Sequence, residues 1–170
     1  DSLLNFPDYR AHEKTYQMLT QVSGRAGRTQ KRGKVIIQSY NPYHQILKQV
    51  TTGDYDTMYA EQIYEREQYK YPPINRIIKI TFKHKNYNTL NEAAEWFSGA
   101  LRTNFGGTVL GPEFPPISRI RNQYLKNVLV KIDKRESLGR TKRNIKRIEK
   151  SFNSISMYRS VRVIYNVDHI

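Results

Sequence analysis

The stretch RIIKITFKH, residues 76–84, is typical of a β-strand, and the elements that follow it decide the fold of the second half of the chain. In chain order we expect a helix at 89–102, strands at 107–112 and 124–133, a helix at 138–152 and a strand at 159–168. The usual solution for this βαββαβ order is a four-stranded antiparallel sheet with both helices on one face. The sequence therefore predicts a ferredoxin-like α+β domain over residues 74–170.

The first part of the chain has a different pattern, which is that of an α/β domain. FPDYRAHEKTYQMLTQV (6–22) predicts a helix, and GKVIIQSYNP (33–42) predicts a buried strand at 35–40. One helix and one strand cannot close a core alone. We therefore interpret residues 1–45 as the last βα-type unit of a domain whose remainder precedes Asp1, and the chain as a fragment of a longer protein.

Between these two parts the sequence predicts a helical connector over residues 46–73. A short helix is expected at 43–50 and a longer one at 54–69, which the pair Pro72-Pro73 follows as a stop signal.

Composition favours a polyanionic partner. The chain has 29 Lys and Arg against 15 Asp and Glu, a formal charge of +14, so nucleic acid is the first expected partner and an anionic membrane the second. No apolar run approaches the eighteen residues of a spanning helix, and the N-terminus lacks the order of a signal peptide, so we expect no membrane partner. The chain has no cysteine, which fits a cytoplasmic protein. Its four histidines lack metal-ligand spacing, so we expect no metal site in these residues.

The stretch QVSGRAGR (21–28) is the most distinctive short motif. On a helix, Gln21, Gly24, Arg25 and Arg28 fall within an arc of about 100°. Planar, permanently charged guanidinium groups suit a polyphosphate, because they neutralise charge that develops on phosphoryl oxygens. A solvated basic helix end is the simpler alternative.

This motif has the pattern Q-x-x-G-R-x-G-R, which resembles motif VI of the superfamily-two helicases. The longer stretch DSLLNFPDYRAHEKTYQMLTQVSGRAGR (1–28) resembles the replication-restart DNA helicases of the primosomal protein N′ family. The resemblance continues through GKVIIQSYNPYH, ILKQVTTGDYDTMYAEQIYERE and YPP into VLGP, and it ends in YNVD (165–168), so it covers essentially the whole chain.

The resemblance implies an end of a RecA-like helicase lobe at residues 1–45. It implies that Arg25 and Arg28 are catalytic, ATP-sensing residues, and that Gln21 and Gly24 contact the nucleotide with them. ATP and Mg²⁺ would be bound mainly by parts of the longer protein that precede Asp1, and zinc only there. We therefore expect this chain alone to have no ATPase activity, although the longer protein hydrolyses ATP.

Positive charge is concentrated near the C-terminus. Residues 119–150 contain twelve Lys and Arg against three acidic residues. Within the helix at 138–152, Leu138, Ile145, Ile148 and Phe152 are expected to face inward and the cations to face outward. We predict that the residues that bind nucleic acid are Arg119, Arg121, Tyr124, Lys126, Arg140, Lys142, Arg143, Lys146, Arg147 and Lys150.

By resemblance, this terminal domain binds forked or single-stranded DNA, the acidic tail of single-stranded-DNA-binding protein and other primosome proteins. The family often has a basic residue directly before the aromatic of this strand, where this chain has Gln123, so the place of the tail pocket stays open. The main alternative is a non-catalytic RNA-binding or ribosomal-type module, because βαββαβ domains with basic helices often bind RNA.

Overall fold

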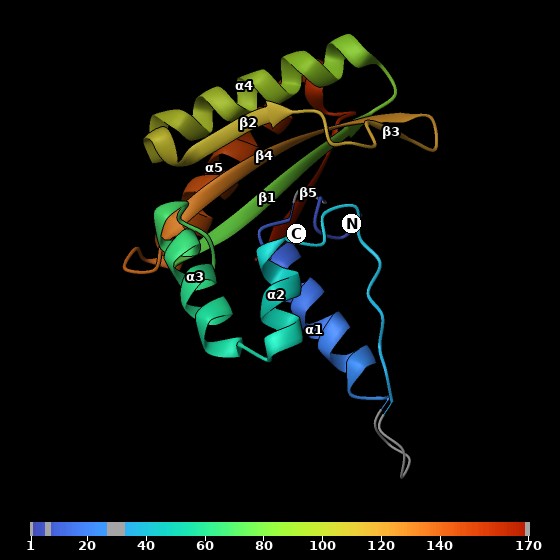
Figure 1. The fold of residues 1–170 in the computed structure, drawn as a ribbon. Helices are drawn as coiled ribbons and strands as arrows, with labels where there is room; N and C mark the ends of the chain where they lie inside the picture. Colours follow the sequence, from blue (N-terminus) through green and yellow to red (C-terminus); the bar gives the residue numbers. More distant parts are fainter. Residues whose placement is uncertain (1, 6–7, 27–32, 169–170) are drawn as a thin grey trace. The chain divides into compact units, whose positions relative to one another are not determined.

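A computed structural model of the chain describes residues 2–5, 8–26 and 33–168, which divide into two compact units (Figure 1). The N-terminal unit is Asp1–Tyr69 and the C-terminal unit is Lys70–Ile170. The C-terminal unit carries twenty Lys and Arg against seven Asp and Glu, which gives it +13 of the chain's formal charge of +14. The positive charge that favours a polyanionic partner therefore lies in the C-terminal unit.

The described part of the N-terminal unit contains three helices, α1 (Ala11–Ser23), α2 (Gln45–Thr52) and α3 (Tyr55–Gln68). They share one apolar core, which consists of Tyr16, Ile46, Leu47 and Met58. The predicted helices at the start of the chain and in the connector are therefore present and pack together. The division of this region at residue 45 and the RecA-like lobe stay predictions.

The strand that we predicted at 35–40 is wrong. Residues 33–39 are extended but form no strand, and Ile36 is 81% exposed. A buried strand needs neighbouring strands to satisfy its backbone and cover its side chains. The described residues of the N-terminal unit include no second strand, so this apolar run has no sheet to join.

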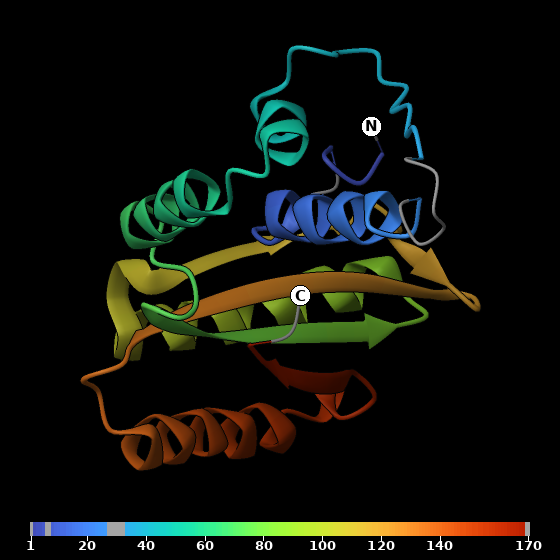
Figure 2. The ribbon, with the colours of Figure 1, turned by 60° about the horizontal axis from the view of Figure 1, so that its bottom comes forward.

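The C-terminal unit is a mixed helix and antiparallel-sheet structure, which confirms the predicted α+β class. Its elements are β1 (Asn75–His84), α4 (Tyr87–Phe105), β2 (Val109–Glu113), β3 (Arg119–Ile120), β4 (Gln123–Asp133), α5 (Leu138–Ser154) and β5 (Arg162–Val167), with 3-10 turns at Gly106–Thr108 and Ser156–Tyr158. The strand order is β2-β4-β1-β5, and β3 pairs only with the start of β4. Figure 2 shows β1 and β4 side by side as the two long central strands.

Both helices of this unit pack on one face of the sheet. Phe82 of β1, Phe97 of α4 and Phe152 of α5 are fully buried, with ring centroids 5.3–6.3 Å apart. Because side chains alternate along a strand, Ile78 and Ile80 face the helices together with Phe82. The strand order and the single helical layer are those expected for the βαββαβ pattern, with β3 as an addition.

Candidate nucleic-acid interface

Helix α5 separates an apolar face from a basic one. Its first turn begins at Ser137, whose hydroxyl accepts from the backbone N–H of Arg140. The expected inward stripe is confirmed for Ile145, Ile148 and Phe152, which are buried, whereas Leu138 is only half-buried and Thr141 is buried with the stripe. The apolar contacts fix the rotation of the helix on the sheet, so the opposite side chains must face outward.

All six cations predicted on α5 are exposed. They lie on an arc of roughly 160° at 100° per residue, and they are Arg140, Lys142, Arg143, Lys146, Arg147 and Lys150. Arg147 also donates a hydrogen bond to the side-chain oxygen of Asn104 at the end of α4, 3.2 Å away. Only Glu149, which is half-buried, borders this basic face on the helix. The helix thus presents six closely spaced cations with little acidic compensation.

A pocket of about 470 Å³ lies where the end of α4 meets the start of α5. Arg135 and Arg140 line it, together with Asn104, Asn144 and the acidic Glu136. Arg135 forms a bidentate pair with Asp133 and lowers the pKa of that carboxyl to about 2. Arg135 is thus already paired, whereas Arg140 has no acidic partner among the described residues and supplies the pocket with an uncompensated cation.

The predicted residues of the β3–β4 hairpin form a second cluster. Arg121 and Asn122 both have left-handed backbones, with φ of 48° and 62°, as the tight turn between two antiparallel strands requires. This turn brings the guanidinium of Arg119 over the ring of Tyr124, 5.0 Å from its centroid. Tyr124 is half-buried and also meets the ring of Tyr87 edge-on at 5.5 Å. Its ring is therefore occupied by protein neighbours.

Lys126 does not lie on the surface as a phosphate-binding residue would. Its side chain is only 10% exposed, and its ammonium lies 3.5 Å from the carboxylate of Glu95 on α4. The position faces the helical layer because β4 places its even-numbered residues there, as with Val128 and Val130. Of the ten predicted residues, this one is placed in a structural ion pair.

Two aromatic residues of this cluster were not predicted. Tyr87 starts α4, and Phe114 follows β2. Their rings stack at 5.5 Å with an interplanar angle of 6°. They are 27 positions apart, so no local spacing connects them, and only the sheet topology brings them together.

Gln21 and Gly24, from the stretch that resembles motif VI, lie at the end of α1, and Arg25 follows them. Gln21 and Arg25 are exposed, and Gly24 ends the helix with a right-handed backbone, φ −66°. Arg28 lies outside the described residues. The structure leaves the side chains of Gln21 and Arg25 accessible to a ligand.

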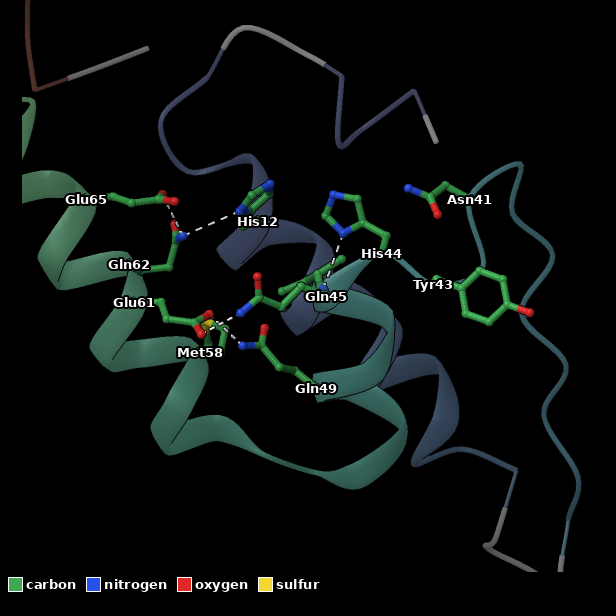
Figure 3. Close-up of a pocket in the computed structure, with 11 residues that line it drawn as sticks. His12, Asn41, Tyr43, His44, Gln45, Gln49, Met58, Glu61, Gln62 and Glu65 are labelled. Carbon is green, nitrogen blue, oxygen red and sulfur yellow. Dashed lines mark hydrogen bonds between the residues drawn. The ribbon is translucent and has the colours of Figure 1, made fainter.

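The N-terminal unit also contains a polar pocket of about 360 Å³ between its three helices (Figure 3). Glu61 accepts hydrogen bonds from Gln45 and from the buried Gln49. The rings of His12 and His44 meet edge-on at 5.4 Å. No sequence motif predicted this pocket, because its residues come from separate helices.

Two further searches concern only the part of the chain that the structure describes. Within it, no group of three or more acidic, histidine or cysteine side chains is arranged to hold a metal ion. None of its helices is long and apolar enough to cross a membrane.

Comparisons with known proteins agree with one another. The sequence profile of a family described as primosomal protein N C-terminal domain matches residues 67–169. The chain is 38% identical over 141 residues to replication restart protein PriA of Bacillus subtilis. The aligned region covers 82% of this chain and 18% of that protein. The same-named protein of Synechocystis is 39% identical over 133 residues, which are 77% of this chain and 16% of that protein. The same-named protein of Haemophilus influenzae is 32% identical over 172 aligned positions, which cover 99% of this chain and 23% of that protein. This chain spans about a fifth of the length of these relatives.

Proposed function

This chain belongs to the family of the primosomal protein N C-terminal domain, and on that premise we propose that it is the C-terminal part of an ATP-dependent DNA helicase that reloads the replication machinery at stalled forks. The shared name of its relatives, replication restart protein, supports a role in replication restart. Helicase activity, ATP hydrolysis and assembly with primosome proteins belong to the longer protein. ATP and Mg²⁺, and any zinc, would be held mainly by parts outside this chain.

The C-terminal unit binds DNA through the basic face of α5. The observation that carries this proposal is the set of six exposed cations on one helix whose opposite side is fixed in the core. Such a helix contacts phosphates and has no reason to read bases, so binding should depend weakly on sequence. Neutralising three to five phosphates would give a slope of log K against log[salt] of roughly −2 to −4, shallower for single strands.

A salt series of fluorescence anisotropy with duplex, forked and single-stranded DNA tests this role. Replacing Arg143, Lys146 and Arg147 with Ala should flatten the slope by about two units and weaken all sequences alike. The matched control removes three exposed cations elsewhere in the same unit, Lys70, Arg159 and Arg162. An equal effect of both triple variants would show that only net charge matters and would remove α5 as the DNA site.

The alternative function, an RNA-binding module, is tested by the same assay. Structured RNA added as a competitor should displace DNA no better than duplex DNA does. A marked preference for structured RNA would favour the RNA-binding module over the helicase fragment.

We further propose that Arg25 and Arg28 sense ATP in the longer protein, with Gln21 and Gly24 beside them. The exposure of Gln21 and Arg25 at the end of α1 supports this role. An arginine that stabilises the transition state of phosphoryl transfer is worth about 10³-fold or more in rate. Arg28→Ala in the longer protein should therefore abolish DNA-stimulated ATP hydrolysis and spare DNA binding. Turnover by the purified chain of residues 1–170 would contradict this assignment.

The acidic tail of single-stranded-DNA-binding protein is a second proposed partner. The pocket beside Arg135 and Arg140 supports it, because a chain-terminal carboxylate suits a site lined by guanidinium groups. Arg140→Ala should weaken binding of a peptide with that acidic tail at least about fivefold, as expected for the loss of a charged hydrogen bond. Unchanged peptide affinity would place the tail elsewhere.

A further inference from the structure

We propose that Tyr87 and Phe114 form a platform on which an unpaired base of single-stranded nucleic acid stacks. This inference rests on the proposed DNA-binding function and adds a second contact site, away from α5. It assigns the stacking role to two residues outside the predicted set, instead of to Tyr124.

The platform belongs to a continuous row of rings with a cation at each end. Arg119 lies over Tyr124, Tyr124 meets Tyr87 edge-on, and Tyr87 stacks on Phe114. The ammonium of Lys126 lies 5.2 Å from the centroid of Phe114 and completes the row. Within it, Tyr124 is half-buried and serves as the support between the hairpin and α4.

Tyr87, the middle ring of the row, and Phe114, its last ring, both keep exposed surface. Tyr87 is 47% exposed and Phe114 37%. The phenylalanines of the core, Phe82, Phe97 and Phe152, meet edge-on or tilted and are all fully buried, as expected where ring contacts serve packing alone. Rings that stack on each other but keep this much open surface can accept a further flat ring.

The backbone holds both residues in place before any ligand arrives. Tyr87 is the first residue of α4, and the side chain of Asn86 caps that helix by accepting from the N–H of Thr89 at 3.0 Å. Phe114 is followed by Pro115 and Pro116, which restrict the backbone on its C-terminal side. Such preorganised rings lose little conformational freedom on binding.

The charges around the platform fit a nucleic-acid strand better than a neutral ligand. Arg119 and Arg121 are exposed on the hairpin, and Lys85 is exposed beside the start of α4. A base on the rings would place its own phosphates among these cations. Base stacking combined with a basic surround is the recurring way in which proteins hold single strands without reading sequence.

The test uses a single-stranded oligonucleotide that carries one 2-aminopurine, whose fluorescence is quenched on stacking, and a duplex of the same length. Tyr87→Leu and Phe114→Leu in the chain of residues 1–170 should each weaken single-strand binding at least about fivefold and reduce the quenching. Duplex affinity should change less than about twofold. Tyr87→Phe keeps the ring and should retain both signals. Tyr64→Leu, at a tyrosine of the N-terminal unit that is 64% exposed, is the matched control.

The outcomes separate this inference from the proposed function. Failure of the unaltered chain to bind any DNA would overturn both. The platform alone would be overturned by two results together. The unaltered chain would bind DNA with a salt slope that depends on α5, and Tyr87→Leu and Phe114→Leu would bind single strands as the unaltered chain does. An equal loss on single strand and duplex would also overturn it. Loss of the 2-aminopurine quenching in Tyr87→Phe that is as complete as in Tyr87→Leu would overturn it too. Preferential binding of an acidic peptide to these rings over the oligonucleotide would also overturn it.

Discussion

The ammonium of Lys126 lies 3.5 Å from the carboxylate of Glu95, which ties β4 to α4 inside the C-terminal unit. The lysine side chain is 10% exposed and the glutamate side chain 59%. The pair is therefore anchored at the lysine end, whose aliphatic stem is packed and whose charge also lies over the ring of Phe114. We therefore expect this lysine to contribute more to stability than the exposed cations of α5 do.

Lys126→Ala should lower the free energy of unfolding by about 1–3 kcal/mol, because it removes buried packing together with the ion pair. Its affinity for duplex DNA should change less than about twofold. Urea unfolding and anisotropy measure the two effects. Lys146→Ala, at an exposed position of α5, should do the reverse: stability within about 0.5 kcal/mol of the parent and weaker DNA binding. A stable Lys126→Ala protein with impaired duplex binding would restore Lys126 to the DNA site.

Phe152 is the most deeply buried of the residues that fix α5 to the sheet. Its ring meets Phe97 and Phe82, and Trp96 lies 5.9 Å away. Phe152→Ala should cost about 3–5 kcal/mol, the usual loss for a fully buried phenylalanine. Because Trp96 is the single tryptophan of the chain, its fluorescence during urea unfolding reports this unit. Met157→Ala, at a residue 49% exposed, is the control and should cost far less. Similar midpoints for the two variants would contradict the role of Phe152.

The strands and helices of the C-terminal unit other than β3 could be predicted, because each of them carries its own local signal. The strand at 76–84 is observed as Asn75–His84, and the helix at 138–152 as Leu138–Ser154. The outward cations of α5 followed from the apolar stripe alone, since burial of one helix face determines the other.

The rest could not be predicted, because it depends on contacts between segments far apart in sequence. The apolar run at 35–40 has the composition of a strand, but only a neighbouring strand could make it one. Lys126 has the appearance of a surface cation until β4 places it opposite Glu95. The stacking of Tyr87 on Phe114 likewise exists only after the sheet has formed.

Gly111 in β2 is predicted to tolerate no side chain. Its φ is +90°, and a Cβ added there would lie 2.7 Å from the backbone oxygen of Asn127 on β4. A backbone atom in a paired strand cannot move aside cheaply, so Gly111→Ala should destabilise the protein by about 1–3 kcal/mol. Gly107→Ala is the matched control, because a Cβ there meets nothing within 4 Å and no left-handed φ is required. It should leave stability unchanged or raise it by about 0.4–1 kcal/mol. Thermal unfolding compares the two, and equal melting temperatures would contradict the clash.

The N-terminal unit should lose stability as the pH falls below the ordinary pKa of histidine, because of His44. Its Nδ1 accepts a hydrogen bond from the backbone N–H of Ile46, 3.3 Å away, and so caps α2 only while that nitrogen is unprotonated. Burial, and then the nearby His12, lower the pKa of His44 in the folded chain. The unfolded chain thus takes up this proton first, at a pKa of about 6.5, so stability is complete above that pH and decreases below it. His44→Asn keeps a capping oxygen that does not titrate. Between pH 7.5 and 5.5 the melting temperature of the parent should therefore fall more than that of the variant. Parallel pH profiles of the two proteins would show that this cap does not respond to pH.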